Sequence, residues 1–126
     1  MASAVWARSV YGTLTGARND KTDAARHTDW GCELAVMVNP GDAAGLTTAH
    51  EVGGDATATE NVMDLNNNAA GIAIAAGLSG AARAVAGCNA AVKAAVDSGA
   101  GTLYLDGSYG VLNRIEDALV QPTNKP

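Results

Sequence analysis

Apolar side chains recur at helical spacing along most of the chain, and this pattern predicts a mainly α fold. The expected helices end or begin at Gly, Ser and the Asn39-Pro40-Gly41 segment, which are typical helix stops and caps. The predicted helices cover residues 2–14, 23–38, 43–52, 60–76 and 81–96, and Asp42 is the expected N-cap of the third. We therefore expect a compact bundle of about five helices.

The segments between and after these helices have the composition of connections. The composition of residues 15–22 predicts a polar connection, and that of residues 53–59, which is rich in Gly, Asp and Thr, predicts a flexible loop. Residues 102–112 predict a short β-hairpin with Asp106-Gly107 at its turn, and residues 121–126 predict a frayed tail. At 126 residues, the chain 1–126 fits a single domain.

Small residues dominate the apolar fraction. The chain is 48% hydrophobic but contains no Phe and has fifteen Gly, so its helices must approach one another closely. Its net charge of −5, without a Lys/Arg cluster, argues against nucleic acid and against an anionic membrane surface as partners. The first residues lack a recognisable signal peptide, and the uncharged stretch 69–82 is too short to span a bilayer. We therefore expect a soluble protein and leave its compartment open.

Two cysteines, Cys32 and Cys88, stand 56 positions apart. Without a second thiol nearby, neither can begin a thiolate zinc site. Both lie in apolar helical surroundings, where a free cysteine packs as a small hydrophobe. We expect two free buried thiols, with a disulfide as the alternative.

Polar side chains interrupt the apolar face of the second predicted helix. Asp23, His27 and Trp30 follow one another at i, i+4 and i+7, on the stripe that continues into the core at Leu34. Arg26 lies beside His27 and three positions from Asp23. Charged groups on a core-facing stripe need partners from elsewhere in the fold.

Two later segments offer such partners. The third predicted helix ends with His50 and Glu51. The fourth carries Asp64, Asn68 and Gly71 on one face, with Asn67 beside them, although Asn residues are poor helix formers. We expect these three segments to converge on one polar site. A structural network that fixes helix packing is the plainer interpretation of any one of them.

The same residues resemble a known but uncharacterised bacterial helical domain family. Its pattern D-A-x-R-H-x-x-W, then A-H-E, then M-D-x-x-N-N-x-x-G matches this chain between Asp23 and Gly71. Such domains are found in secreted and toxin-associated proteins and in short orphan proteins. This chain departs from the family after Gly71, where Ile72 to Ala75 are apolar instead of polar. The resemblance implies a helical fold and brings no established reaction.

The leading functional hypothesis is a hydrolase that activates water. It assigns acid–base roles to one set of side chains and substrate binding to another. The catalytic candidates are His27, His50, Glu51 and Asp64, and the substrate-binding candidates are Arg26, Trp30, Asn67 and Asn68. A divalent metal is a variant of this hypothesis, with Asp23 and His27 as its first ligands.

Two alternatives belong to other classes of protein. One is a non-enzymatic module that binds a small polar or anionic ligand in the same polar site. The other is a structural or partner-binding domain, in which stripes of Ala and Gly on residues 73–87 pack against a second copy of the chain. A homodimer is the partner implied by that last hypothesis.

Overall fold

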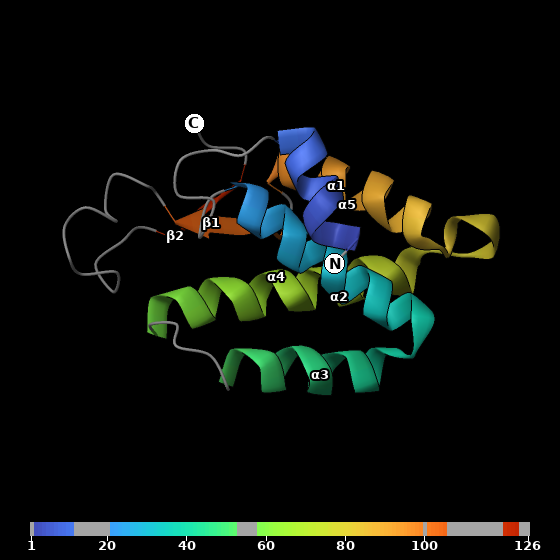
Figure 1. Cartoon of the computed structure of the whole chain (residues 1–126), viewed down its shortest axis with the longest axis horizontal. Coiled ribbons are helices and arrows are strands. Elements are labelled where there is room, and N and C mark those ends of the chain that lie inside the picture. Colours follow the sequence, from blue (N-terminus) through green and yellow to red (C-terminus); the bar gives the residue numbers. More distant parts are fainter. Residues whose placement is uncertain (1, 12–20, 53–57, 100, 106–119, 124–126) are drawn as a thin grey trace.

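The structure is a computed structural model of the chain. It describes residues 2–11, 21–52, 58–99, 101–105 and 120–123, and within these it describes the side chains of residues 5–11, 22–49, 63–99, 101, 102 and 123 (Figure 1). The predicted connection from residue 15 to residue 20 and most of the predicted loop, 53–57, lie outside the described residues.

The described part of the chain is mainly α, with five helices, as the apolar pattern predicts. The elements in chain order are α1 (Ala2–Tyr11), α2 (Lys21–Met37), α3 (Pro40–Val52), α4 (Ala58–Gly77), the short 3-10 turn η1 (Gly80–Ala82), α5 (Val85–Ser98), β1 (Leu103–Leu105) and β2 (Val120–Pro122). No helix in these ranges combines the length and the apolar character that crossing a membrane requires.

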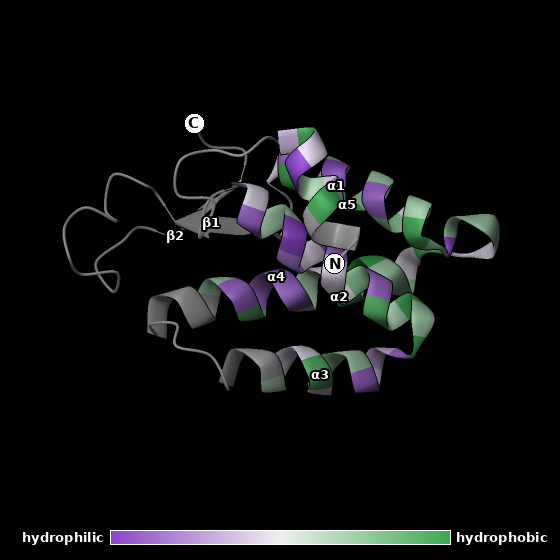
Figure 2. Cartoon of the chain, viewed as in Figure 1, coloured by the Kyte–Doolittle hydropathy of each residue, from purple (hydrophilic) through white to green (hydrophobic). Residues whose placement is uncertain are grey.

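Helix α2 occupies the centre of the bundle and contacts each of the four other helices (Figure 1). Helix α3 packs against α4 and α2, whereas α1 and α5 cover another side of α2. Both α2 and α4 carry hydrophilic turns in the half that precedes their apolar ends (Figure 2). A helix surrounded in this way buries its polar residues together with its apolar ones, which is how the site described below arises.

Small side chains make up most of the core, as the composition predicts. The buried apolar cluster consists of Ala7, Ala25, Cys32, Ala35, Ala43, Ala75, Cys88, Val92 and Val96. Helices α2 and α4 touch through their backbones: a Cβ atom at Gly71 would lie 1.9 Å from the Thr28 carbonyl oxygen, and one at Gly31 would lie 2.5 Å from that of Asn68. Glycine is therefore required on both sides of this crossing.

The start of α3 differs from the expectation that Asp42 is its cap. The Asn39 side-chain oxygen accepts a hydrogen bond from the Asp42 backbone N–H at 2.8 Å, and the Asn39 amide donates to the Asp42 carboxylate at 2.7 Å. Asn39 is thus the N-cap, Pro40 is the first helical residue, and the Asp42 carboxylate holds the Asn39 side chain in its capping position. The helix begins three residues earlier than the predicted position of Ala43.

Arg83 ties together the ends of two helices. Its guanidinium donates to the carbonyl oxygens of Ala75 at 3.1 Å and of Ala35 at 3.4 Å, in the last turns of α4 and α2. A cation placed there satisfies carbonyls that have no partner within their helix and opposes the negative end of each helix dipole.

The C-terminal strands differ from the predicted hairpin. Strand β1 coincides with the first predicted strand, but it pairs antiparallel with β2, with Leu103 opposite Pro122. The predicted turn at Asp106-Gly107 and the strand that follows it lie outside the described residues. Gln121 and Pro122 belong to β2 instead of a frayed tail. Thr123 is buried, and its hydroxyl group is satisfied there: it lies 2.5 Å from the Thr102 hydroxyl and donates to the Val96 carbonyl at 2.6 Å.

The expectation of two free thiols is wrong. Cys32 of α2 and Cys88 of α5 form a disulfide, with their Cα atoms 5.8 Å apart. Both were correctly placed in the apolar core. Their pairing depends on the packing of α5 against α2, which spacing along the chain does not reveal.

Candidate functional site

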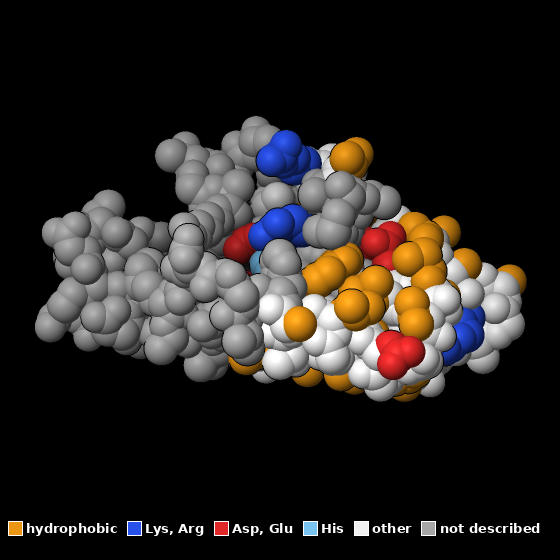
Figure 3. Space-filling view, turned by 60° about the horizontal axis from the view of Figure 1, so that its bottom comes forward, with side chains coloured by type: hydrophobic (Ala, Val, Ile, Leu, Met, Phe, Trp, Pro, Cys, Tyr) orange, Lys and Arg blue, Asp and Glu red, His pale blue; other side chains and the backbone are white. Residues whose placement is uncertain are grey.

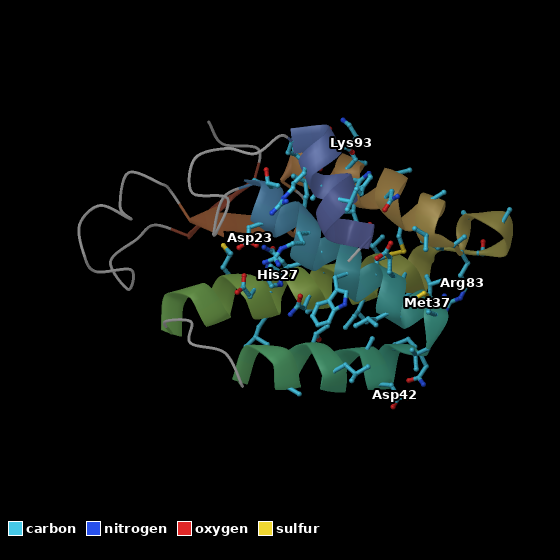
Figure 4. The ribbon with its side chains drawn as sticks, viewed as in Figure 1. Asp23, His27, Met37, Asp42, Arg83 and Lys93 are labelled. Atoms are coloured by element: carbon cyan, nitrogen blue, oxygen red, sulfur yellow. A yellow bond between two sulfur atoms is a disulfide. The ribbon has the colours of Figure 1, made fainter. Side chains whose placement is uncertain are left out.

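The first half of α2 carries the centre of the candidate site. Asp23 and His27 are one helical turn apart, so both side chains lie on the face that α2 turns toward α4 (Figure 4). Asp64 comes from α4 and meets them there. Three predicted site residues from two helices are therefore brought together, as the sequence pattern predicts.

One ring nitrogen of His27 is the meeting point. Its Nε2 atom lies 3.6 Å from Asp23 Oδ1 and 3.4 Å from Asp64 Oδ1. The three ligand-type atoms all lie within 4.8 Å of one another. This arrangement differs from a catalytic His–Asp pair, in which the carboxylate holds one ring nitrogen and the other nitrogen faces the substrate. Here two carboxylates approach the same nitrogen.

Arg26 joins the same cluster from the solvent side. Its Nη2 donates a short hydrogen bond to Asp23 Oδ1, and its Nε donates to the same oxygen at 3.0 Å. Nη2 also lies 3.0 Å from His27 Nε2. A guanidinium has no acceptor atom, so a hydrogen bond from Arg26 to this nitrogen uses the lone pair of Nε2, whereas a hydrogen bond from Nε2 to either carboxylate uses its proton; the tautomer of His27 decides which is made.

Arg26 is more exposed to solvent than the other members of the cluster. The side chains of Asp23, His27 and Asp64 are 4%, 6% and 10% exposed, whereas that of Arg26 is 37% exposed. Figure 3 shows basic, acidic and histidine side chains gathered at one place on this face of the molecule. Two buried carboxylates are costly without compensating positive charge, and Arg26 supplies it to Asp23.

The other predicted site residues lie in three different situations. Asn67 and Asn68 are fully buried on α4, where the backbone of Asn68 forms the crossing with α2. Trp30 is half-buried on α2, one turn beyond His27. A direct contact of these three with a substrate stays a prediction. His50 and Glu51 belong to the last turn of α3, but their side chains lie outside the described part of the chain.

A second acidic pair on α2 was missed by the sequence analysis. Asp29 and Glu33 are one turn apart and buried. Burial, together with the charge of Glu33, raises the pKa of Asp29 to about 7. Burial likewise raises the pKa of Glu33, whose Oε1 has no hydrogen-bond partner among the described residues.

This pair could have been found only by predicting that α2 lies at the centre of the bundle. A helix that is surrounded by its neighbours buries acids on every face, including those that an amphipathic pattern assigns to solvent. With the Asn89 amide oriented so that its nitrogen faces α2, that nitrogen donates to both carboxylate oxygens of Asp29 at 2.9 Å. Asn89 of α5 therefore supplies hydrogen bonds to one member of this pair, Asp29.

A comparison with known proteins gives a family and no activity. The family described as a domain of unknown function (DUF6973) matches residues 2–99, which include all five helices and the Asp23, His27 and Asp64 cluster. The match extends well beyond the Asp23 to Gly71 segment that carries the recognised pattern. No curated protein and no solved structure matches the chain.

Proposed function

Since the chain belongs to this family of unknown function, we propose from the site alone that Asp23, His27 and Asp64 bind a divalent cation that activates water for hydrolysis. The observation that carries this proposal is the approach of two carboxylate oxygens to one imidazole nitrogen. A general base would need that nitrogen to face water. A metal ligand needs the nitrogen and the oxygens to face one point.

The spacing of the three atoms supports a coordination centre. Nitrogen and oxygen ligands held about 2.1 Å from a tetrahedral Zn²⁺ lie about 3.4 Å from one another. The distances from His27 Nε2 to the two carboxylate oxygens are 3.4 and 3.6 Å. One imidazole and two carboxylates suit Zn²⁺, Mn²⁺ or Fe²⁺ better than the softer, thiolate-seeking ions.

The contact between Arg26 and His27 also fits the proposal. Metals bind neutral imidazole through a nitrogen lone pair, and a hydrogen bond from Arg26 to Nε2 uses that same lone pair. Three protein ligands leave at least one coordination position for water, whose pKa a bound metal lowers toward neutrality. Asp23 and Asp64 then hold the cation, while their burial limits competition from bulk water.

Metal titration of the full chain tests the proposal. After treatment with a chelator, calorimetric titration with Mn²⁺ and Zn²⁺ is expected to show about one equivalent bound. The Asp64→Asn variant should bind at least about tenfold more weakly, because it removes one charged ligand. Asp97→Asn is the matched control: this exposed carboxylate pairs with Lys93 on α5, far along the chain from the site, and its loss should leave metal binding unchanged.

Activity forms the second part of the test. Hydrolysis of a panel of chromogenic esters by the metal-loaded protein is expected to fall in Asp64→Asn and to persist in Asp97→Asn. Absence of metal binding by the wild type would refute the proposal. In that case a large loss of thermal stability in His27→Ala would identify the cluster as a structural network, which the burial of its members favours as the second candidate.

A further inference from the structure

Arg26 occupies the lone pairs that a metal would need. It bonds Asp23 Oδ1 through two nitrogens and approaches His27 Nε2 with one of them, so it contacts two of the three proposed ligand atoms. A divalent cation bound to the same atoms would repel the guanidinium and remove its acceptors. The two cations therefore cannot hold these positions at the same time.

We propose that Arg26 and the metal exchange at the site, and that the displaced Arg26 then binds the anionic group of a phosphate ester substrate. This inference rests on the proposed metal centre and names its regulation and its substrate class. In the metal-free protein, Arg26 neutralises the buried carboxylate of Asp23. In the metal-bound protein, the cation neutralises Asp23 instead.

The exposure of Arg26 makes the exchange physically accessible. Its side chain is 37% exposed, whereas the three proposed ligands are at most 10% exposed. The guanidinium can leave by rotation of its long side chain into solvent, while Asp23 and His27 remain fixed on α2. Among the residues that the structure describes, its side chain bonds only to Asp23 and His27, the two groups that the metal would take.

The released arginine remains attached beside the metal. A guanidinium offers parallel N–H donors that match two oxygens of a phosphate group, and a neighbouring metal polarises a third. An arginine and a divalent cation together stabilise the charge that develops in phosphoryl transfer. Metal binding should therefore create an oxyanion site, and the coupling must be reciprocal: phosphate should tighten metal binding by the same factor.

The first measurement is Mn²⁺ affinity by calorimetry for the wild type, Arg26→Gln and Arg26→Lys. Arg26→Gln should bind Mn²⁺ about tenfold more tightly, because the competing cation is gone, whereas Arg26→Lys should stay closer to the wild type. Arg8→Gln controls for the change in net charge, because Arg8 is exposed on α1. Its Mn²⁺ affinity should equal that of the wild type.

The second measurement is ³¹P relaxation of inorganic phosphate, with acetate as the competing oxyanion. The Mn²⁺-loaded wild type should broaden the phosphate signal strongly, and Arg26→Gln should lose most of this effect although it binds Mn²⁺ more tightly. Preferential competition by acetate would overturn the phosphate class. Weaker Mn²⁺ binding by Arg26→Gln would show that Arg26 supports the ligands, and would overturn the exchange while the metal centre stands. Absence of Mn²⁺ binding by both proteins would overturn the metal centre and the exchange together.

Discussion

Asp29 is a fully buried carboxyl group on the central helix, and its protonation state is linked to the stability of the fold. Burial, reinforced by the charge of Glu33, raises its pKa from 3.8 to about 7. The folded chain therefore binds a proton more tightly than the unfolded chain. The stabilisation is complete below the unfolded pKa and is lost as the pH rises through about 7.

We expect the free energy of unfolding of the wild type to fall between pH 5 and pH 8 because Asp29 must ionise inside the protein. Asp29→Asn should flatten this dependence and should be more stable than the wild type at pH 8, by on the order of a few kcal/mol at most. Urea denaturation across this pH range measures both effects. Asp97→Asn, an exposed acid, should keep the wild-type slope. An unchanged slope in Asp29→Asn would contradict the assignment.

At the same scale, the sequence allowed Asp23, His27 and Asp64 to be predicted as neighbours. Helical spacing places Asp23 and His27 on one face, and a buried charge requires partners. The role of Asn39 was misassigned, since Asn39 and Asp42 are both good capping residues and only their mutual hydrogen bonds distinguish them. The position of Arg26 over His27 Nε2 depends on side-chain conformation, which spacing alone does not determine.

At the scale of elements, the crossing of α2 and α4 decides where the site residues lie. Gly71 faces the Thr28 carbonyl and Gly31 faces that of Asn68, so neither position has room for a methyl group. This close contact brings Asp64 of α4 within reach of His27. The close approach between helices that the small residues predict is thus found at this crossing.

Gly71→Ala should therefore be strongly destabilising. The new Cβ atom would overlap the Thr28 backbone at 1.9 Å, and we expect a loss on the order of 3 kcal/mol in the free energy of unfolding. Gly45→Ala on α3 is the matched control, because nothing lies within 4 Å of its Cβ position. Its higher helix propensity should stabilise the fold by up to about 1 kcal/mol. Equal melting temperatures for the two variants would disprove the close crossing.

Helices were more predictable than strands. Each of the five predicted helices corresponds to an observed one, because the apolar spacing and the Gly and Pro boundaries are local signals. The partner of β1 was not predictable in the same way. Its pairing with Val120–Pro122 joins segments separated by more residues than a tight hairpin turn contains, so no turn residue marks it.

At the scale of the whole molecule, the Cys32–Cys88 disulfide joins the central helix to α5 across 56 positions. Closing a loop of this length reduces the entropy of the unfolded chain, and the entropic model gives about 4 kcal/mol of stabilisation. The small side chains of the core contribute less burial per residue than large ones would. The disulfide compensates for part of the stability that larger core side chains would contribute.

The double variant Cys32→Ser/Cys88→Ser should lose several kcal/mol of stability, about as much as the wild type loses when it is reduced. Thermal melting with and without dithiothreitol measures both. Reduction should leave the melting temperature of the double variant unchanged, which separates the disulfide from other effects of the reductant. A wild type that is insensitive to complete reduction would contradict a stabilising role.

The position of α2, surrounded by the other helices, has a consequence for how the site can move. Local unfolding usually begins in segments with few buried contacts, and α2 is the opposite of such a segment. The backbone positions of Asp23 and His27 can move away from that of Asp64 only when α2 leaves α4, which amounts to opening the bundle itself. The helix positions that hold these three residues together are therefore as durable as the folded state, and Arg26, which is the most exposed member of the cluster, has the most freedom to move.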